Sequence, residues 1–294
     1  MLNKLVLGTV QFGQKYGIAN KRGKIPKDEV LRILEYACNL GITILDTAHL
    51  YGKSEQILGE CIKKAKSDFK LISKLAPSSE LNYKKVKDIV CKSIHRLERK
   101  NVYGYLIHEQ ESEDFMESVK LWNILVKLKK KRLVKKIGFS LYKPEELELI
   151  FEKAKDCDIV QIPYSIFDRR FGNYLKILKE NNIEIHVRSI FLQGLVFLNP
   201  KNLPVNLIRA KPYIEKLQNL ALENNIAINT LCLDFVLLNP SVDKVVIGVD
   251  SLEHLKKDIK AIGLIEKVRS IYNELEKLNI EDKDIILPYR WSEE

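Results

Sequence analysis

Residues 43–52 read TILDTAHLYG, a stretch that combines a predicted strand with two chemically active side chains. The apolar run 43–45 has the length of a buried strand, and Asp46 follows it directly. Tyr51 lies in the turn that comes next. Ligands of parallel sheets bind beyond the carboxyl ends of the strands, so both side chains are expected at a ligand site.

Two further apolar runs end in the same way. Residues 71–72 lie just before Ser73 and Lys74, and residues 105–107 precede His108. The carboxyl ends of parallel strands meet at one edge of a sheet, so these side chains should converge with Asp46 and Tyr51. A carboxylate, a phenol, an amine and an imidazole in one place form a set of groups that can transfer protons.

Strand-like runs recur along the whole chain and alternate with segments of helical periodicity. The runs lie near residues 5–8, 43–46, 70–73, 103–107, 134–139, 158–162, 183–187 and 244–247. Eight strands with about eight helices predict an α/β fold, a closed (β/α)8 TIM barrel. A doubly wound sheet is the structural alternative, but it would normally carry G-x-G-x-x-G after its first strand. The glycines at this point, Gly8, Gly13 and Gly17, are spaced differently.

No linker, low-complexity tract or break in composition divides the chain, so we expect a single barrel domain over residues 1–294. The interval between the last two strands is too long for one strand–helix unit. It contains two helical patterns, 211–224 and 229–238. From about residue 264 the chain should add a C-terminal helix, over 265–278, and then a tail.

The composition narrows the class of protein. The chain has 294 residues, 46% of them hydrophobic, with no run of 18 apolar residues, so no membrane span or membrane partner is expected. The N-terminus enters a strand without a signal-peptide pattern, which favours a cytoplasmic protein. The five cysteines are odd in number and lack C-x-x-C, which argues against a disulfide framework and a zinc site. No metal site is expected.

The net charge of +10 raises the question of nucleic-acid binding. The densest basic segment, residues 127–136, falls where a helix ends and a strand begins, and cations stabilise helix C-termini. Such junctions lie at the end of a barrel opposite the ligand site. We therefore interpret the segment as a solvated helix end and expect no nucleic-acid partner.

The converging side chains suit the reduction of a carbonyl group, in which a hydride reaches carbon while a proton reaches oxygen. A tyrosine is a poor acid at its usual pKa of about 10. A nearby ammonium lowers that pKa, and a carboxylate can hold the ammonium in place. Tyr51, Lys74 and Asp46 fit these roles, and His108 would orient the substrate oxygen.

The motif of Asp46-Thr47-Ala48 followed by Tyr51-Gly52 and Ser54-Glu55 strongly resembles the aldo-keto reductases. That family's tetrad of Asp, Tyr, Lys and His maps residue by residue onto Asp46, Tyr51, Lys74 and His108. The resemblance covers nearly the whole chain and implies a (β/α)8 barrel that binds a nicotinamide cofactor without a Rossmann motif. It implies an NAD(P)H-dependent oxidoreductase that reduces an aldehyde or ketone, sugar-derived carbonyls included, with Tyr51 as proton donor.

The same resemblance implies a set of cofactor-binding residues. Ser140 and Gln161 would hold the nicotinamide carboxamide, and a run after the seventh strand would lie along the pyrophosphate. The implied set is Thr9, Ser140, Gln161, Arg188, Ser189, Phe191, Gln193, Gly248, Val249, Ser251 and His254.

Arg188 is a departure from the family pattern, which commonly has a tyrosine that stacks on the nicotinamide at this position. A guanidinium plane can stack on an aromatic ring, or it can bind an anionic substrate.

A second departure concerns the adenosine end of the cofactor. NADP-specific members use Lys and Arg to bind the 2′-phosphate, but the matching residues here are Gly248 and His254. Asp250 adds a carboxylate, which repels a phosphate and can accept hydrogen bonds from a ribose diol. NADP remains the family default, and these departures make NAD the alternative.

Two other functions compete with carbonyl reduction. One is a non-catalytic protein that binds the cofactor and a partner with the same fold. The other is an isomerase or lyase in which Lys74 forms a Schiff base. The identity of the carbonyl substrate depends on the loops around the barrel mouth, and the sequence specifies no oligomeric state.

Overall fold

The computed structural model describes residues 1–108 and 116–291 and contains a closed barrel of eight parallel strands. The strands are β1 (Leu5–Gly8), β2 (Ile44–Asp46), β3 (Lys70–Leu75), β4 (Val102–His108), β5 (Val134–Ser140), β6 (Ile159–Pro163), β7 (Glu184–Arg188) and β8 (Lys244–Gly248). Each strand pairs with the next in sequence, and β1 pairs with β8 to close the barrel. The predicted (β/α)8 fold is confirmed, with strand ends within two residues of the predicted ranges.

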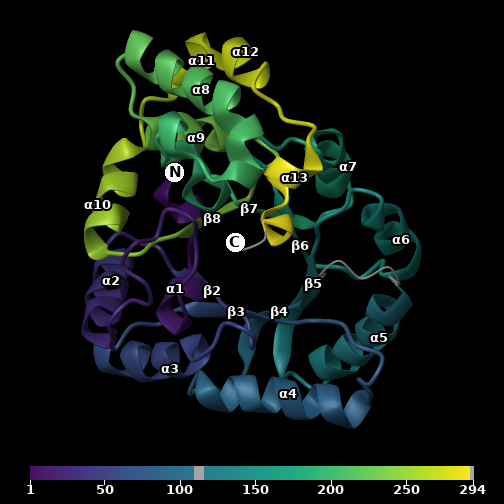
Figure 1. Cartoon of the computed structure of the whole chain (residues 1–294). Helices are drawn as coiled ribbons and strands as arrows, with labels where there is room; N and C mark the ends of the chain where they lie inside the picture. The colour runs from purple at the N-terminus through teal and green to yellow at the C-terminus, as the bar shows by residue number, and fades with distance from the viewer. Residues whose placement is uncertain (109–115, 292–294) are drawn as a thin grey trace.

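Helices surround the barrel (Figure 1). The α-helices are α1 (Val10–Gly13), α2 (Lys27–Asn39), α3 (Ser54–Ala65), α4 (Tyr83–Arg96), α5 (Met116–Lys130), α6 (Glu146–Lys153), α7 (Leu175–Glu180), α8 (Lys211–Glu223), α9 (Ile228–Leu237), α10 (Leu252–Ala261), α11 (Ile265–Ser270), α12 (Tyr272–Glu276) and α13 (Lys283–Ile286). The short 3-10 helices are η1 (Leu2–Lys4), η2 (Gly172–Tyr174), η3 (Leu192–Phe197), η4 (Pro200–Asn202), η5 (Val205–Ala210) and η6 (Pro288–Arg290). No single helix of the described residues is long and apolar enough to cross a membrane. Two consecutive helical segments, Val205–Glu223 and Ile228–Leu237, would together be long and apolar enough, but the chain bends by 94° between them.

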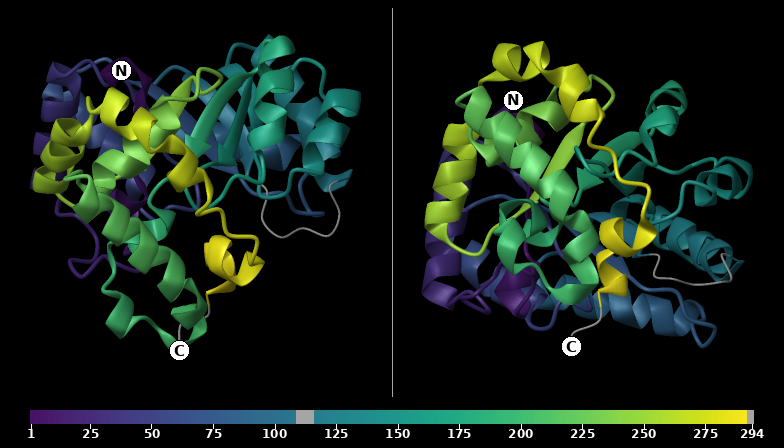
Figure 2. Two further views of the ribbon diagram at one scale, coloured as in Figure 1. Left: turned by 90° about the horizontal axis from the view of Figure 1, so that it is seen from above. Right: turned by 45° about the horizontal axis from the view of Figure 1, so that its top comes forward.

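The C-terminal region differs from the prediction in one respect. The single helix expected over 265–278 is divided into α11 and α12, because Ile271 between them has non-helical backbone angles, φ −113° and ψ 15°. Val268 in α11 and Leu275 in α12 are both buried. The chain then continues to a tail that lies on the opposite side of the barrel from the N-terminus (Figure 2).

The interior of the barrel explains where the polar site residues lie. A compact apolar cluster joins Val6, Ile44, Ile72, Leu106 and Ile159, which come from five different strands. Side chains alternate along a strand, so the residue two positions further on faces the same interior, nearer the carboxyl end. Those residues are Gly8, Asp46, Lys74, His108 and Gln161. The apolar layer therefore forms the floor beneath the predicted site.

The opposite end of the barrel interior contains a separate group of charges. Glu184 forms an ion pair with Lys136 and accepts a hydrogen bond from His186 Nε2 at 2.8 Å. Burial opposes the ionisation of Glu184, but the hydrogen bonds from His186 and Lys136 outweigh it and lower its pKa to about 2. Glu184 thus has two partners at this end, away from the cavity, so we assign the group a structural role.

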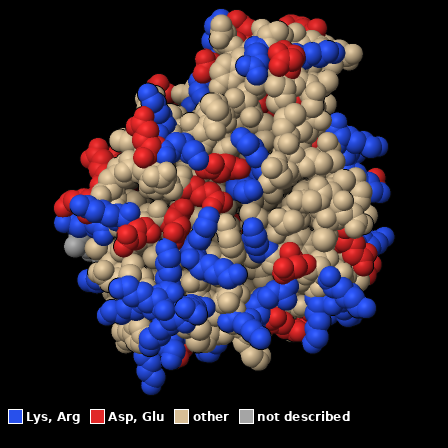
Figure 3. All heavy atoms as spheres, turned by 180° about the vertical axis from the view of Figure 1, so that it is seen from behind, with Lys and Arg blue, Asp and Glu red and all other residues tan. Residues whose placement is uncertain are grey.

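The basic segment 127–136 lies at a helix end, as interpreted from the sequence. Lys127, Lys129 and Lys130 occupy the last turn of α5, and Lys129 Nζ lies 2.6 Å from Asp158 Oδ2. Figure 3 shows Lys and Arg side chains gathered on the lower half of the face opposite to the view in Figure 1. Carboxylates neutralise part of this charge, which agrees with a solvated surface.

The turn that carries Tyr51 packs closely against the chain after β1. A Cβ atom added at Gly13 would lie 1.8 Å from the Tyr51 carbonyl oxygen and 2.6 Å from the Ser54 amide nitrogen. Gly52 has φ +54°, a conformation that favours glycine, and its own Cβ would lie 2.7 Å from the Gly13 oxygen. Only glycines at both positions allow the two backbones to approach this closely.

We expect Gly13→Ala to lower the free energy of unfolding by about 1–3 kcal/mol or more, since the new methyl group overlaps backbone atoms that cannot rotate away. Urea denaturation measures the change. Gly172→Ala is the matched control, because its nearest neighbour, the Cβ of Arg169, would lie 3.9 Å away. Equal stability of the two variants would contradict the close packing of the Tyr51 turn.

Candidate active site

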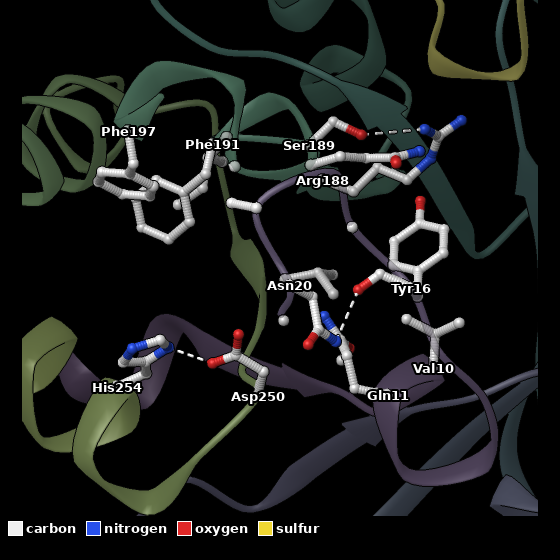
Figure 4. Close-up of a pocket in the computed structure, with 18 of the residues that line it drawn as sticks. Val10, Gln11, Tyr16, Asn20, Arg188, Ser189, Phe191, Phe197, Asp250 and His254 are labelled. Carbon is white, nitrogen blue, oxygen red and sulfur yellow. Dashed lines mark hydrogen bonds and ion pairs between the residues drawn. The ribbon is translucent and has the colours of Figure 1, made fainter. Parts of the chain in front are cut away.

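A cavity of about 760 Å³ opens at the carboxyl ends of the strands. Eleven of the fifteen residues predicted for catalysis or cofactor binding line it, which leaves four that do not. The eleven are Thr9, Asp46, Tyr51, His108, Gln161, Arg188, Ser189, Phe191, Gln193, Gly248 and His254. Figure 4 shows part of this lining, with side chains from β1, β7 and β8 and their loops facing one another.

The other four residues, Lys74, Ser140, Val249 and Ser251, are buried behind the lining. Ser140 Oγ donates to Gln161 Oε1 at 3.3 Å, so it contacts a lining residue. Ser251 Oγ accepts the His254 amide N–H at 3.1 Å and caps α10. Direct cofactor contacts by Ser140, Val249 and Ser251 stay predictions, and their observed contacts are with the protein itself.

Lys74 and Asp46 form a buried ion pair at the base of the cavity. The Lys74 side chain is 0% exposed and that of Asp46 5% exposed. The Lys74 ammonium bonds to Asp46 Oδ1 and donates to the Thr47 carbonyl oxygen at 2.9 Å. Gln161 Nε2 donates to the second oxygen, Asp46 Oδ2, at 2.8 Å. The pair thus receives support from both β3 and β6.

Tyr51 and His108 lie next to this pair. Lys74 Nζ is 5.2 Å from the centroid of the Tyr51 ring. The rings of Tyr51 and His108 are 6.2 Å apart between centroids and nearly perpendicular, at 86°. The four residues of the predicted tetrad therefore meet in one place, with the phenol and the imidazole lining the cavity and the ammonium beneath the phenol.

Three hydroxyl groups hold the Tyr51 turn to the barrel. Thr9 Oγ1 donates to the Asp46 carbonyl oxygen at 2.9 Å. Ser54 Oγ lies 3.0 Å from Thr9 Oγ1 and donates to the Thr9 carbonyl oxygen at 2.8 Å. Thr47 Oγ1 donates to Ser54 Oγ at 3.0 Å. Thr9 lines the cavity, and these bonds show that it also joins β1 to the turn.

The electrostatics of the tetrad differ from the expectation that Lys74 lowers the pKa of Tyr51. Burial raises the pKa of Tyr51, and the Asp46 carboxylate raises it further. Burial lowers the pKa of Lys74, although Asp46 opposes this shift. Burial, together with the charges of Lys74 and Arg188, holds the pKa of His108 well below its usual range. In this state the phenol is a neutral donor and the imidazole is uncharged at neutral pH.

Arg188 lies at the end of β7, held by three contacts. Its guanidinium carbon is 4.1 Å from the centroid of the Tyr142 ring. Nη2 donates to the Leu141 carbonyl oxygen at 2.8 Å, and Nη1 donates to Ser189 Oγ at 3.3 Å. The guanidinium is thus fixed before any ligand binds.

The end of the cavity near β8 carries charges of both signs. His254 and Asp250 form an ion pair, and their hydrogen bond raises the pKa of His254. Arg22 Nη1 donates to the Asp250 carbonyl oxygen at 3.0 Å. Asp258 accepts from Asn229 at 3.3 Å, and burial raises its pKa to about 6. Lys257 is exposed and also lines this end.

The loop after β7 has a strained backbone where it borders the cavity. Ser189, Leu192 and Gln193 have φ of +61°, +45° and +52°, which costs non-glycine residues on the order of 1–3 kcal/mol each. The Gln193 carbonyl oxygen accepts the Ile18 amide N–H at 3.1 Å from the loop after β1. The two loops therefore meet across the cavity, and this contact stabilises the strained conformation.

Several lining residues were not predicted from the sequence, among them Gln11, Tyr16, Asn20, Tyr142 and Lys257. Tyr142 comes two residues after the fifth strand, a position that could have been noted as a strand-end candidate. The other four lie within helices or in the loop after β1, where no sequence pattern marks them.

The lining suits a long polar ligand such as the nicotinamide cofactor. Gln11 Oε1, His108 Nδ1 and Arg188 Nε are buried and have no hydrogen-bond partner among the described residues. Buried polar atoms are normally satisfied, so these three positions favour a ligand with polar groups. A Cβ at Gly248 would come within 3.0 Å of Gln11, so glycine leaves room there.

Comparison with known proteins agrees with this geometry. Residues 4–280 match the model of the aldo/keto reductase family. An uncharacterized oxidoreductase of Bacillus subtilis is 30% identical over 258 residues, which cover 80% of this chain and 82% of the relative. The NADH-specific methylglyoxal reductase of Escherichia coli is 22% identical, and 90% of each chain is covered.

Solved structures show the same fold. The holo form of an aldo-keto reductase from Bacillus halodurans superimposes with a TM-score of 0.74 at 20% identity, covering 96% of this chain and 94% of that one.

The ion pair at the base of the cavity leads to a stability prediction. We expect Asp46→Leu or Lys74→Met alone to cost about 3–5 kcal/mol, because each leaves an uncompensated buried charge. The double variant should recover much of that loss, since it removes both charges together. Chemical denaturation of the three variants measures the coupling. Additive losses in the double variant would show that the two charges do not depend on each other.

Proposed function

The chain belongs to the aldo/keto reductase family, and from this premise we propose that it reduces an aldehyde or ketone to an alcohol with NADH or NADPH. The observation that carries the proposal is the position of Tyr51, which lines the cavity above the buried Lys74–Asp46 pair and beside His108. These are the groups that proton delivery to a carbonyl oxygen requires.

The nicotinamide cofactor supplies the hydride that adds to the carbonyl carbon. Tyr51 donates its phenolic proton to the carbonyl oxygen, and solvent then returns a proton to the phenolate. The Lys74 ammonium, 5.2 Å from the Tyr51 ring centroid, stabilises the negative charge that the phenol gains. Neutral His108 orients the carbonyl oxygen by a hydrogen bond. Burial of this site strengthens each of these interactions.

The cofactor would lie along the cavity between its two ends. Gln161, backed by Ser140, is placed to bind the carboxamide near the tetrad. Ser189 and Gln193 lie along the strained loop after β7, and His254 lies near β8. The polar groups of Ser189 and Gln193 suit the pyrophosphate, and that of His254 suits the adenosine.

The two competing functions have less support. Schiff-base chemistry needs an accessible neutral amine, whereas the Lys74 side chain is fully buried and bound to Asp46 and Thr47. A purely binding role would not require the complete tetrad. Fluorescence titration with NADH and NADPH, followed by a panel of aldehydes that includes sugar-derived ones, tests the proposal directly. Cofactor binding without turnover of any aldehyde would favour the non-catalytic role.

We expect Tyr51→Phe to abolish carbonyl reduction while the Kd for the cofactor changes by no more than a few-fold, because only the proton donor is removed. Steady-state kinetics and fluorescence titration measure the two quantities. His108→Ala should retain more activity, with kcat/KM about 10²- to 10⁴-fold lower, the usual effect of an acid–base or positioning group. A Tyr51→Phe enzyme with most of its kcat would refute the assignment.

The preference between NADPH and NADH depends on the end of the cavity near β8. His254 stands where the family resemblance implies a ligand of the 2′-phosphate, but its charge is balanced by Asp250. The E. coli methylglyoxal reductase is NADH-specific by its name, and it supports NADH use by this chain. We infer that the preference for NADPH is weak.

We expect the Kd values of NADPH and NADH to differ by less than about tenfold. Asp250 raises the pKa of His254, so protonation on acidification begins above its ordinary pKa and should tighten NADPH alone. His254→Arg should tighten NADPH by roughly tenfold, the effect of one charge-assisted contact, and leave NADH unchanged. A preference for NADPH above a hundredfold that survives His254→Ala would identify another cation, such as Lys257 or Lys21, as the phosphate ligand.

A further inference from the structure

Arg188 has features that cofactor binding alone does not explain. It lines the inner end of the cavity, where Tyr16 also lies, and in Figure 4 the Tyr16 hydroxyl points toward its guanidinium. The contacts with Tyr142, Leu141 and Ser189 fix the group in place. Its Nε is buried and has no partner among the described residues. The guanidinium thus offers an unused donor to the cavity.

No carboxylate of the described residues lies within ion-pair distance of Arg188, whereas the neighbouring Arg170 is bound by Asp168 at 2.7 Å. Three carboxylates line the cavity, and each has another partner: Asp46 has Lys74, Asp250 has His254 and Asp258 has Asn229. Among the described residues, the inner end of the cavity therefore holds one positive charge, on Arg188, without a carboxylate partner. A largely buried charge is costly unless a partner neutralises it.

This charge acts on the reacting groups themselves. Burial and Lys74 lower the pKa of His108, and Arg188 adds to that shift. Arg188 also opposes the rise in the pKa of Tyr51 that burial causes. Arg188, Tyr51 and His108 line the same cavity, so one small molecule in that cavity can offer a carbonyl to Tyr51 and a second group to Arg188.

If the Arg188 guanidinium stacked on the nicotinamide ring, its positive charge would still lack a negative partner. One face of the guanidinium already rests on Tyr142, and a second aromatic ring would supply no negative charge. The nicotinamide ring becomes positive when hydride leaves it, so a lone cation beside it opposes the reduction of substrate. A substrate carboxylate would compensate both charges and would satisfy the free Nε–H.

We propose that the substrate is a carbonyl compound that also carries a carboxylate, and that Arg188 binds this carboxylate while Tyr51 and His108 face the carbonyl oxygen. The proposal rests on the proposed function and leaves its chemistry unchanged: carbon gains the hydride of NAD(P)H, oxygen gains the Tyr51 proton, and the carboxylate is unaltered. The phenol of Tyr16 is positioned as a further donor to the anion.

Matched substrates test the proposal. 4-Carboxybenzaldehyde and 4-formylbenzamide have nearly the same shape, as do glyoxylate and glyoxylamide, and only the first of each pair is charged. We expect kcat/KM to be at least tenfold higher for a carboxylate than for its amide in the wild-type enzyme. Arg188→Gln should lower kcat/KM for the carboxylate by about 10- to 100-fold more than for its amide, the effect of a charge-assisted hydrogen bond. Arg188→Lys should restore part of the selectivity.

Lys143→Gln is the control variant, because Lys143 adjoins Tyr142 in sequence but does not line the cavity. It removes the same formal charge and should leave the selectivity intact. A second readout uses unreactive ligands: calorimetry of benzoate and benzamide should give tighter binding of benzoate to the wild type and to Lys143→Gln, but not to Arg188→Gln.

The outcomes separate this inference from the proposed function. Equal kcat/KM within both pairs, with the amides reduced well, would overturn the inference and keep carbonyl reduction. Failure to reduce any aldehyde with either cofactor would overturn the proposed function, while benzoate binding would still test Arg188. Weaker NADH binding by Arg188→Gln with carboxylate selectivity intact would assign the guanidinium to the cofactor and contradict the inference.

Discussion

The Lys74 ammonium cannot be hydrated at its position, because its side chain is fully buried. It needs Asp46 and the Thr47 carbonyl oxygen as partners, and Asp46 in turn accepts a hydrogen bond from Gln161. One charge therefore links β2, β3 and β6 at the point where the cavity begins. The geometry around Tyr51 follows from this interaction, since the phenol lies over the ammonium and its turn begins at the same β2 carboxylate.

Burial of Tyr51 also bears on the direction of proton transfer. The charge of Lys74 is largely balanced by Asp46, and burial dominates the pKa of Tyr51, which rises. A phenol that stays protonated suits a reductase, because it must deliver a proton to the product oxygen. On the proposed mechanism, the Lys74 ammonium stabilises the transition state, because negative charge develops on the phenol as the proton leaves.

Two charged side chains near β8 form an ion pair, whereas Arg188 near the tetrad forms none with the described residues. Near β8, His254 and Asp250 neutralise each other, which leaves a weak field for a phosphate. Near the tetrad, Arg188 stands without a carboxylate among the described residues. Electrostatic attraction in a site of low dielectric constant is strong, and our proposal of a carboxylate-bearing substrate rests on this difference between the two ends.

The parts of this structure that the sequence predicted are those that depend on local periodicity. Short apolar runs that end in Asp46, Lys74 and His108 placed these residues at the carboxyl ends of strands, and the structure confirms that position. The parts that it missed depend on contacts between distant segments. The break at Ile271 has no Gly or Pro to mark it in the sequence, and Tyr16 lines the cavity from a loop without a pattern.

The loop after β7 shows most clearly that contacts with a distant segment can determine a local backbone conformation. Of the eight described non-glycine residues with positive φ, five follow helices, where this conformation is a common way to end them. The other three, Ser189, Leu192 and Gln193, have no local preference for it. Their conformation is maintained by the hydrogen bond from Ile18 and by packing of Gly194 against Ala19, across the cavity. The shape of the loop is thus imposed by the β1 side of the barrel, and no local pattern in its own sequence could reveal it.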